Sequence, residues 1–414
     1  MHNKITIDEA GELNDPELLR QVNVLRKTDN ATNWYYLARE YLFLAALIGG
    51  TIAFYYLLLD NGLSLLWSVP VTLLCIVGVG AGQHRLATLT HEAAHYMLFR
   101  SRLLNEFVSE WFCMFPILGT THSYRVQHLG HHQYPNDPEK DPDWTQLTLS
   151  GHKFEFPMSR GRFLWECVVK QILWPPHLIR YVLVRAFFKV DRDDGTPYRM
   201  HRRVSPKLLL VSLAFHLLLI GGLTWAAVQG GTALLFAIGG GLLAGAVALY
   251  GFLPETWFPD YFIKPDLKPR TTARMRLVFN TLVLTGLAWL TVVTGRPCWL
   301  YFFALWMLPL GSSFAFFMIL RQLVQHGNAD RERFTNTRVF FVNRLISLSV
   351  FPIGNDLHLP HHLFPMVPHY NLHALHELLM ETAEYQSGAT IVEGYFLPTE
   401  SPPTHPTVLD VMTH

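Results

Sequence analysis

Six stretches of the chain are nearly free of charged side chains and are long enough to cross a lipid bilayer. A transmembrane helix needs about 20 consecutive, mostly apolar residues. Only a very short turn separates the two members of each consecutive pair. The pairs are Tyr41–Leu59 with Leu63–Gln83, Leu208–Gln229 with Thr232–Leu253, and Leu277–Thr294 with Pro297–Leu320. This pattern predicts an all-α integral membrane protein with about six transmembrane helices in three hairpins.

The distribution of basic residues predicts how these hairpins are oriented. Three hairpins place both chain ends and every long connection on one side of the membrane. Lys and Arg crowd the long connections, whereas the turns on the opposite side contain only Arg296. Because basic residues favour the cytosolic side, we expect both termini to be cytosolic, at a bacterial inner membrane or the endoplasmic reticulum. The connections 84–206, 254–276 and 321–414 would then form a cytosolic cap.

Two further apolar segments do not look like spans. Asn105–Gly119 is short and contains Glu106 and Glu110, and Arg162–Lys189 mixes aromatic with basic residues and breaks at Pro175-Pro176. Amphipathic helices with basic and aromatic side chains lie in the plane of the membrane interface. We therefore expect both segments to be interfacial helices.

The two ends of the chain are more polar than its middle. Asp15-Pro16-Glu17 is typical of a helix start. A signal peptide is not expected, because the N-terminal segment lacks the pattern of a basic region, an apolar core and a cleavage site. The tail after Pro398 is rich in Pro and Thr and is expected to be disordered. The predicted organisation is an N-terminal segment 1–40, a membrane domain 41–380 with its cap, and a tail 381–414.

Composition agrees with a membrane protein. Of the 414 residues, 50% are hydrophobic and only 16% are charged, against about 25% charged residues in soluble chains. The net charge of +1 gives no reason to expect nucleic-acid binding. The four cysteines are scattered without a Cys-x-x-Cys pair, which argues against a disulfide framework or a thiolate metal site and favours a role as buried apolar filler.

Histidines recur at a spacing that places them on one face of a helix. Residues at i, i+3 and i+4 share a helical face, and the pattern His-x-x-His-His occurs twice, with a His-x-x-x-His pattern before it. A single histidine is usually solvated or hydrogen-bonded, but three such sets at the aqueous ends of apolar segments indicate a polynuclear metal site. The sets are His91 and His95, then His128, His131 and His132, then His358, His361 and His362.

Three histidines outside these sets receive different predictions. Continued as a helix, the sixth span carries His326 about 9 Å beyond Leu320, at the depth of the three sets, so we predict it as a ninth ligand. His84 precedes His91 by two turns, about 10 Å deeper, which favours a capping or structural role over a place beside the metal. His216 is expected to pack between helices.

Nine imidazoles are too many for one metal ion, and four or five for each of two ions is a plausible division. Imidazole binds iron, zinc, copper and nickel. At a membrane the expected substrate is a lipid or another apolar molecule, whose carbon–hydrogen bonds are unactivated. Attack on such a bond requires a redox metal and dioxygen, which favours two iron ions. Nearby polar residues could orient the ring nitrogens and offset charge, although loop acids are often merely solvated. The candidates are Glu92, Asp137, Asp141 and Asp143.

The third histidine set contains Pro360, which is acceptable in the first turn of a helix. Asn355 or Asp356 would then lie near the N-cap. Alternatively, Asn355 could hold a metal-bound water.

These residues resemble the membrane fatty acid desaturase family. The resemblance covers roughly residues 40–380 and rests on three histidine boxes in the family's order, with Asp-Pro-Asp after the second box and Leu-Phe-Pro after the third. The boxes are His91…His95, His128-x-x-His131-His132 and His358-x-x-His361-His362.

The resemblance implies a di-iron, dioxygen-dependent enzyme that removes two hydrogens from an acyl chain. It implies no catalytic side chain beyond the metal ligands and no organic cofactor. Electrons would come from a separate ferredoxin or cytochrome b5, since no His-Pro-Gly-Gly haem signature occurs in the chain. A hydroxylase or ketolase of a lipid, carotenoid or other small apolar molecule would use the same boxes and stays open. A metal-binding transporter is disfavoured because transporters place ionisable groups midway within their spans.

Overall fold

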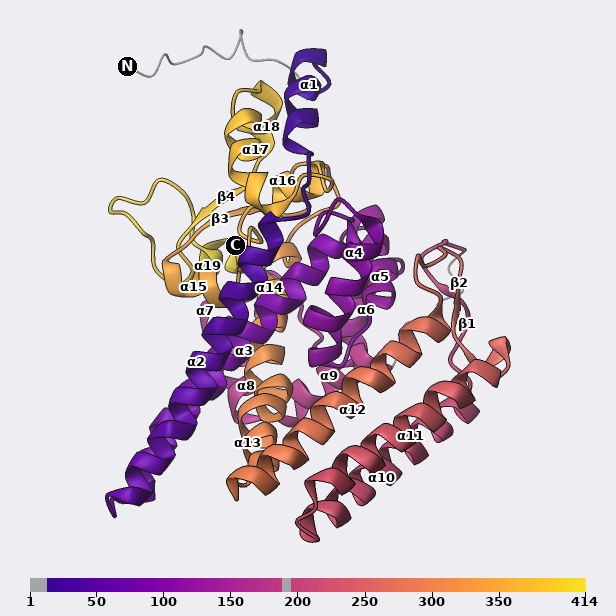
Figure 1. Ribbon diagram of the computed structural model, residues 1–414. Helices are drawn as coiled ribbons and strands as arrows, with labels where there is room; N and C mark the ends of the chain where they lie inside the picture. The colour runs from indigo at the N-terminus through magenta and orange to yellow at the C-terminus, as the bar shows by residue number, and fades with distance from the viewer. Residues whose placement is uncertain (1–12, 188–194) are drawn as a thin grey trace.

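The computed structural model describes residues 13–187 and 195–414 and shows an all-α membrane protein (Figure 1). Within these residues, six helical segments are long and apolar enough to cross a membrane. The last of them is interrupted by π-helical turns. They are α2 (Thr32–Asp60), α3 (Ser68–Ala94, after the turn Leu65–Trp67), α10 (Pro206–Val228), α11 (Thr232–Phe252), α12 (Pro269–Thr294), and Cys298–His326, which comprises α13 (Cys298–Phe302), η7 (Phe303–Met307), η8 (Leu310–Phe314) and α14 (Ala315–His326).

The six predicted spans are confirmed as three helical hairpins. Helix α3 packs against α2 and the sixth span, whereas α12 packs against α10, α11 and α13. The hairpin turns lie at one end of the molecule, and α1, α16, α17 and α18 lie at the other (Figure 1). The cap therefore gathers at the ends of the spans that carry the histidines, and its cytosolic location remains a prediction.

Two spans, α2 and α12, begin more than one helical turn before the residue that the hydropathy pattern predicted. Helix α2 starts at Thr32 because its polar first turns are buried by the cap: Asn33 donates to the carbonyl of Leu98 at 2.7 Å, and Glu40 pairs with Arg85. Helix α12 likewise starts at Pro269, a residue suited to the first helical turn. Apolarity alone therefore located the spans but not their cap-side ends.

The connection after α3 folds into helices that carry the second histidine box. The expected helical character of Asn105–Gly119 is confirmed, although a π-turn interrupts it. Its position relative to the membrane stays a prediction. The elements are α4 (Arg102–Val108), η3 (Ser109–Met114), η4 (Phe115–Ile117), α5 (Thr121–Gln133) and α6 (Pro142–Leu149).

The second expected interfacial segment is also helical and breaks at Pro175 as predicted. Its predicted end, Lys189, lies outside the described residues. The elements are α7 (Arg160–Phe163), η5 (Leu164–Val169), α8 (Lys170–Leu173) and α9 (Pro176–Phe187).

The rest of the cap is built from short helices and two small sheets. Strand β1 (Met200–Arg202) pairs antiparallel with β2 (Asp260–Tyr261), and β3 (Val339–Phe341) pairs parallel with β4 (Ile391–Glu393). The helices are α1 (Pro16–Leu25), η6 (Glu255–Trp257), α15 (Arg344–Ser349), α16 (His358–Leu363), η9 (His369–Asn371), α17 (Leu372–Leu379), α18 (Ala383–Gly388) and α19 (Val408–Thr413).

The two chain ends gave opposite outcomes. Helix α1 starts as predicted, with Asp15 accepting from the backbone N–H of Leu18 at 3.3 Å. The prediction of a disordered tail was wrong, because α19 is closed by a capping box between Thr407 and Asp410 and buries Met412 in the core. The prediction relied on the proline and threonine content of the tail and overlooked the apolar residues of its last helical turn.

Candidate metal centre

The nine predicted histidines come together as two adjacent groups at the cap-side ends of the spans. In each group, one nitrogen from every ring lies within 4.8 Å of the corresponding nitrogens of the others. The five-histidine group contains His91, His95, His128, His132 and His361, and the four-histidine group contains His131, His326, His358 and His362.

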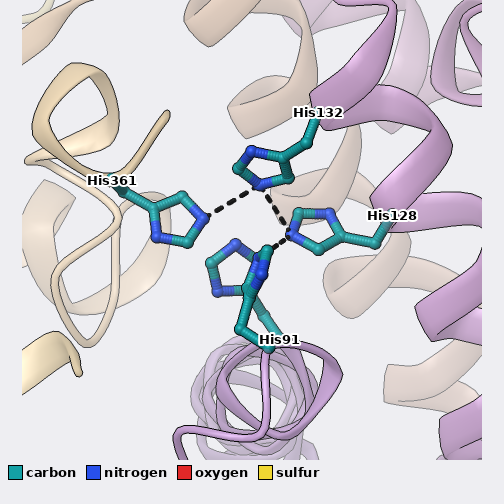
Figure 2. A group of neighbouring side chains, drawn as sticks. His91, His128, His132 and His361 are labelled. Carbon is teal, nitrogen blue, oxygen red and sulfur yellow. Dashed lines mark hydrogen bonds between the residues drawn. The ribbon is translucent and has the colours of Figure 1, made fainter. Parts of the chain in front are cut away.

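Helices α3, α5 and α16 supply the five-histidine group. The rings converge from three sides with their Nε2 atoms inward (Figure 2). Nε2 of His128 lies 2.8 Å from that of His95 and 3.0 Å from that of His132, and Nε2 of His361 lies 3.1 Å from that of His132. Elements far apart in sequence thus present several donor atoms to one small volume.

The four-histidine group joins the end of the sixth span to α5 and α16. Nε2 of His326 lies 3.1 Å from that of His131 and 3.0 Å from that of His358, and Nε2 of His362 lies 3.2 Å from that of His358. His326 ends α14, which agrees with its predicted depth. The sixth span therefore connects directly to this group.

Each His-x-x-His-His box divides between the two groups in a fixed way. His128 and His132, four residues apart, enter the five-histidine group, whereas His131 enters the other. In the third box His358 and His362 stay together and His361 crosses over. At 3.6 residues per turn, the i+3 and i+4 side chains lie on the same face as residue i but on opposite sides of it. The spacing therefore serves two neighbouring centres from a single helix.

The hydrogen bond made by the outer nitrogen of a ring determines its tautomer, and therefore whether the inner nitrogen presents a lone pair. Nδ1 of His326 lies 3.0 Å from the carbonyl oxygen of Asn336, which only accepts, so Nδ1 carries the proton. In a neutral ring, Nε2 of His326 then offers a lone pair toward Nε2 of His131. Facing lone pairs repel one another unless a proton or a metal cation lies between them.

The spacing of the nitrogens fits a shared metal ion. Metal–imidazole bonds are about 2.0–2.1 Å long, so two such nitrogens at right angles around one ion lie about 3.0 Å apart. The nearest Nε2 pairs in both groups lie between 2.8 and 3.2 Å apart. Both groups could therefore hold a metal ion through neutral imidazoles.

Asp141 is the acid that contacts a histidine most directly from outside the groups. Both of its oxygens lie 3.0 Å from Nδ1 of His131, and they also accept the backbone N–H groups of Asn136 and Asp143. Burial lowers the pKa of His131, but the Asp141 carboxylate outweighs burial and raises that pKa to about 9. Asp141 thus holds the proton on Nδ1, and a metal ion bound at Nε2 would displace the second proton of the ring.

The other predicted orienting residues lie in different surroundings. Glu92 lies 3.3 Å from Nδ1 of His91, and the charge of Asp143 acts on His131. Asp137 instead pairs with Arg331 at 3.1 Å and closes its own turn. Asn355 donates to Thr88 at 3.1 Å. It is not a cap, because the N-cap of α16 is Leu357 and no side chain caps this helix.

His84 lies outside both groups. Its Nδ1 lies 2.7 Å from the carbonyl oxygen of Ser349, which agrees with a structural role. His216 bridges two helices, since its Nε2 lies 2.8 Å from the side-chain amide nitrogen of Asn280. This contact confirms the predicted packing between helices.

Two contacts of the centre were not predicted. The ring of Tyr124 stacks on His128 with centroids 5.4 Å apart, and the carbonyl of Asn336 holds His326. Tyr124 precedes His128 by one helical turn, so helical spacing could have revealed it. The contact with the Asn336 carbonyl could not be predicted, because any residue type provides a backbone carbonyl.

The model of the family described as fatty acid desaturase matches residues 65–262 and 240–394. These regions include both histidine groups and most of the spans. The chain belongs to the fatty acid desaturase family. Its histidine groups are capable of binding metal.

A curated relative supports the same assignment at a distance. The chain is 28% identical over 186 residues to dihydrorhizobitoxine desaturase of Bradyrhizobium elkanii. The match covers 43% of this chain and 47% of the relative, so the chain spans about half the length of that protein. The resemblance therefore supports desaturase-type chemistry and leaves the substrate open.

Proposed function

We propose that this protein is a dioxygen-dependent membrane desaturase whose two histidine groups each hold one iron ion. The observation that carries the proposal is the division of nine histidines into groups of five and four within a fatty acid desaturase family member. When bound, iron would supply the activation of dioxygen needed to attack an unactivated carbon–hydrogen bond. Neutral imidazoles fit iron, and the protein selects the metal by geometry and ligand type.

The side chains around the centre would set the orientation and charge of its ligands. Asp141 holds His131 by its Nδ1 proton, and the Asn336 carbonyl does the same for His326. Such outer partners fix the ring orientation and tautomer of metal-binding histidines. Because the nine ligands carry no charge as neutral imidazoles, the nearby carboxylates Asp141 and Asp143 offset the charge of the metals.

The proposed reaction converts a carbon–carbon single bond to a double bond. Two hydrogens leave the substrate, and dioxygen takes them together with two electrons and two protons to form two water molecules. The substrate is a fatty acyl chain or another lipid. The electrons come from a separate ferredoxin or cytochrome b5, and the centre faces the cytosol, where such donors reach it.

Hydroxylation or ketolation by the same centre is the second candidate. The relative's name specifies desaturation, which favours loss of two hydrogens over gain of an oxygen. The position of the substrate carbons relative to the centre decides between these outcomes.

Mass spectrometry of a host expressing the protein with an electron donor tests the proposal. Lipids and polar metabolites are compared between the wild type and His131→Ala. We expect a species lighter by two hydrogens with the wild type alone. A species heavier by one oxygen would establish hydroxylation instead. Equal product from His131→Ala at equal protein level would overturn the role of the histidine groups.

A further inference from the structure

A small cavity of about 110 Å³ lies on the membrane side of the histidine groups. Several helices that carry the histidines line it one turn earlier in their sequence. Ala87 precedes His91 by four residues, and Tyr124 precedes His128 by four. Four residues of helix rise about 6 Å, so a molecule in this cavity lies close to both groups.

Three arginines line this cavity, whereas none of the described lining residues is acidic. Arg185 donates to the hydroxyl of Tyr181 at 2.9 Å, and Arg276 donates to the carbonyl of Gly119. The nearest acids lie outside the lining: Asp143 interacts electrostatically with both Arg185 and Arg321, and Glu110 interacts with Arg276. The three guanidinium groups therefore exceed the nearby carboxylates.

Arg321 is the least satisfied of the three. Its residue is 7% exposed, and within the described chain its Nε has no hydrogen-bond partner. It lies in the sixth span, five residues before His326. Burying a charged side chain costs free energy unless the charge is paired and hydrogen-bonded. Because Arg321 shares one carboxylate, Asp143, with Arg185 and lies beside two proposed metal centres, an anion in the cavity would balance its charge.

We propose that this cavity binds the carboxylate of the substrate, with Arg321 as its main partner. The planar guanidinium group pairs with carboxylates through two parallel hydrogen bonds. The volume is below the roughly 300–1,000 Å³ of a drug-sized site, so the cavity holds a small acid or the acidic end of a larger one. The substrate is therefore a free acid that reacts a few bonds from its carboxylate. This inference rests on the proposed function, since it names that enzyme's substrate class.

Binding of matched short-chain probes tests the proposal without turnover. The purified protein, with its metals and in a neutral detergent, is titrated with sodium hexanoate, hexanamide and hexyl phosphate in the absence of an electron donor. We expect hexanoate to bind at least about tenfold more tightly than hexanamide. Arg321→Gln should abolish that difference.

Two variants control for folding and for overall charge. Arg321→Lys keeps the charge but loses the planar fork, and it should bind hexanoate with intermediate affinity. Arg344→Gln removes an exposed arginine on the cap and should leave hexanoate binding unchanged. Elution as a monodisperse peak with normal metal content shows that each variant is folded.

Three results would overturn the carboxylate site. They are equal binding of hexanoate and hexanamide, unchanged hexanoate binding in folded Arg321→Gln, or tighter Arg321-dependent binding of hexyl phosphate, which would assign the cavity to a phosphate headgroup. Failure of the proposed function looks different, because Arg321-dependent hexanoate binding would persist while no oxygen-dependent product forms. Desaturation of a neutral lipid at full rate by Arg321→Gln would uphold the function and reject the site.

Discussion

Nδ1 of His131 lies 3.0 Å from each carboxylate oxygen of Asp141, and both side chains are buried. Asp141 is also the N-cap of α6, where its Oδ1 accepts the backbone N–H of Asp143. One carboxylate therefore orients a proposed metal ligand and starts the helix that covers it. Because of this double role, we expect substitution of Asp141 to have a larger effect than substitution of the other acids around the centre.

Asp141→Asn should weaken metal retention by about 10–100-fold, the usual effect of changing a partner of a metal-binding histidine. The amide can keep the N-cap through its oxygen but loses the charge that holds the proton on His131. The measurement is iron remaining after dialysis against a graded series of chelator concentrations. Asp137→Asn is the matched control, because Asp137 pairs with the exposed Arg331. Equal retention by both variants would contradict the role of Asp141.

Removing one ring from the five-histidine group should lower the metal content. We expect His361→Ala to lose about half of the metal bound by the wild type, or more if the two centres fill together. Elemental analysis of purified protein gives the ratio of iron to chain. His405→Ala removes a half-buried histidine near the C-terminus that pairs with Glu393 and should keep the wild-type ratio. A full complement of metal in folded His361→Ala would exclude this residue as a ligand.

The sequence predicted the spans and the histidine groups because both depend on periodic patterns. Apolar runs located the six helices, and the spacing within each box placed its rings on one helical face. The depth argument correctly brought His326 to the other boxes. Such features are local, so they need no knowledge of the tertiary fold.

What the sequence could not reveal depends on contacts between distant segments. It could not distinguish among the candidate acids, because only folding brings Asp141 rather than Asp137 to His131. It also assigned no role to Arg321, because the cavity that this residue lines is formed by helices far apart in the chain. The prediction of a disordered tail failed for the same reason, since Met412 is buried by core residues that lie far from it in the sequence.

Glu110 should make the stability of the protein depend on pH. Burial raises the pKa of its carboxyl to about 8, although Arg276 opposes the shift, whereas an unfolded Glu has a pKa of about 4.3. A raised folded-state pKa gives a stabilising contribution that is complete below about pH 4.3 and is lost as the pH rises through about 8. The whole contribution is at most about 5 kcal/mol.

Thermal unfolding in detergent from about pH 5 to about pH 9 measures this effect. We expect the melting temperature of the wild type to fall across this range more steeply than that of Glu110→Gln, which cannot ionise. Glu155→Gln alters an exposed carboxylate and should follow the wild type. Parallel curves for the wild type and Glu110→Gln would show that Glu110 titrates normally.

Close packing of α3 against the sixth span makes Gly80 intolerant of a side chain. A Cβ at this position would clash with Oγ of Ser313 and lie 2.6 Å from the backbone nitrogen of Phe314. Small residues allow such close approach between membrane helices, and overpacking typically costs about 1–3 kcal/mol. Gly80→Ala should therefore lower the melting temperature in detergent. Gly49→Ala is the matched control, because no atom of residues 13–187 or 195–414 would lie within 4 Å of a Cβ at Gly49. This variant should melt like the wild type. Equal melting of the two variants would show that the contact between α3 and the sixth span is looser than described.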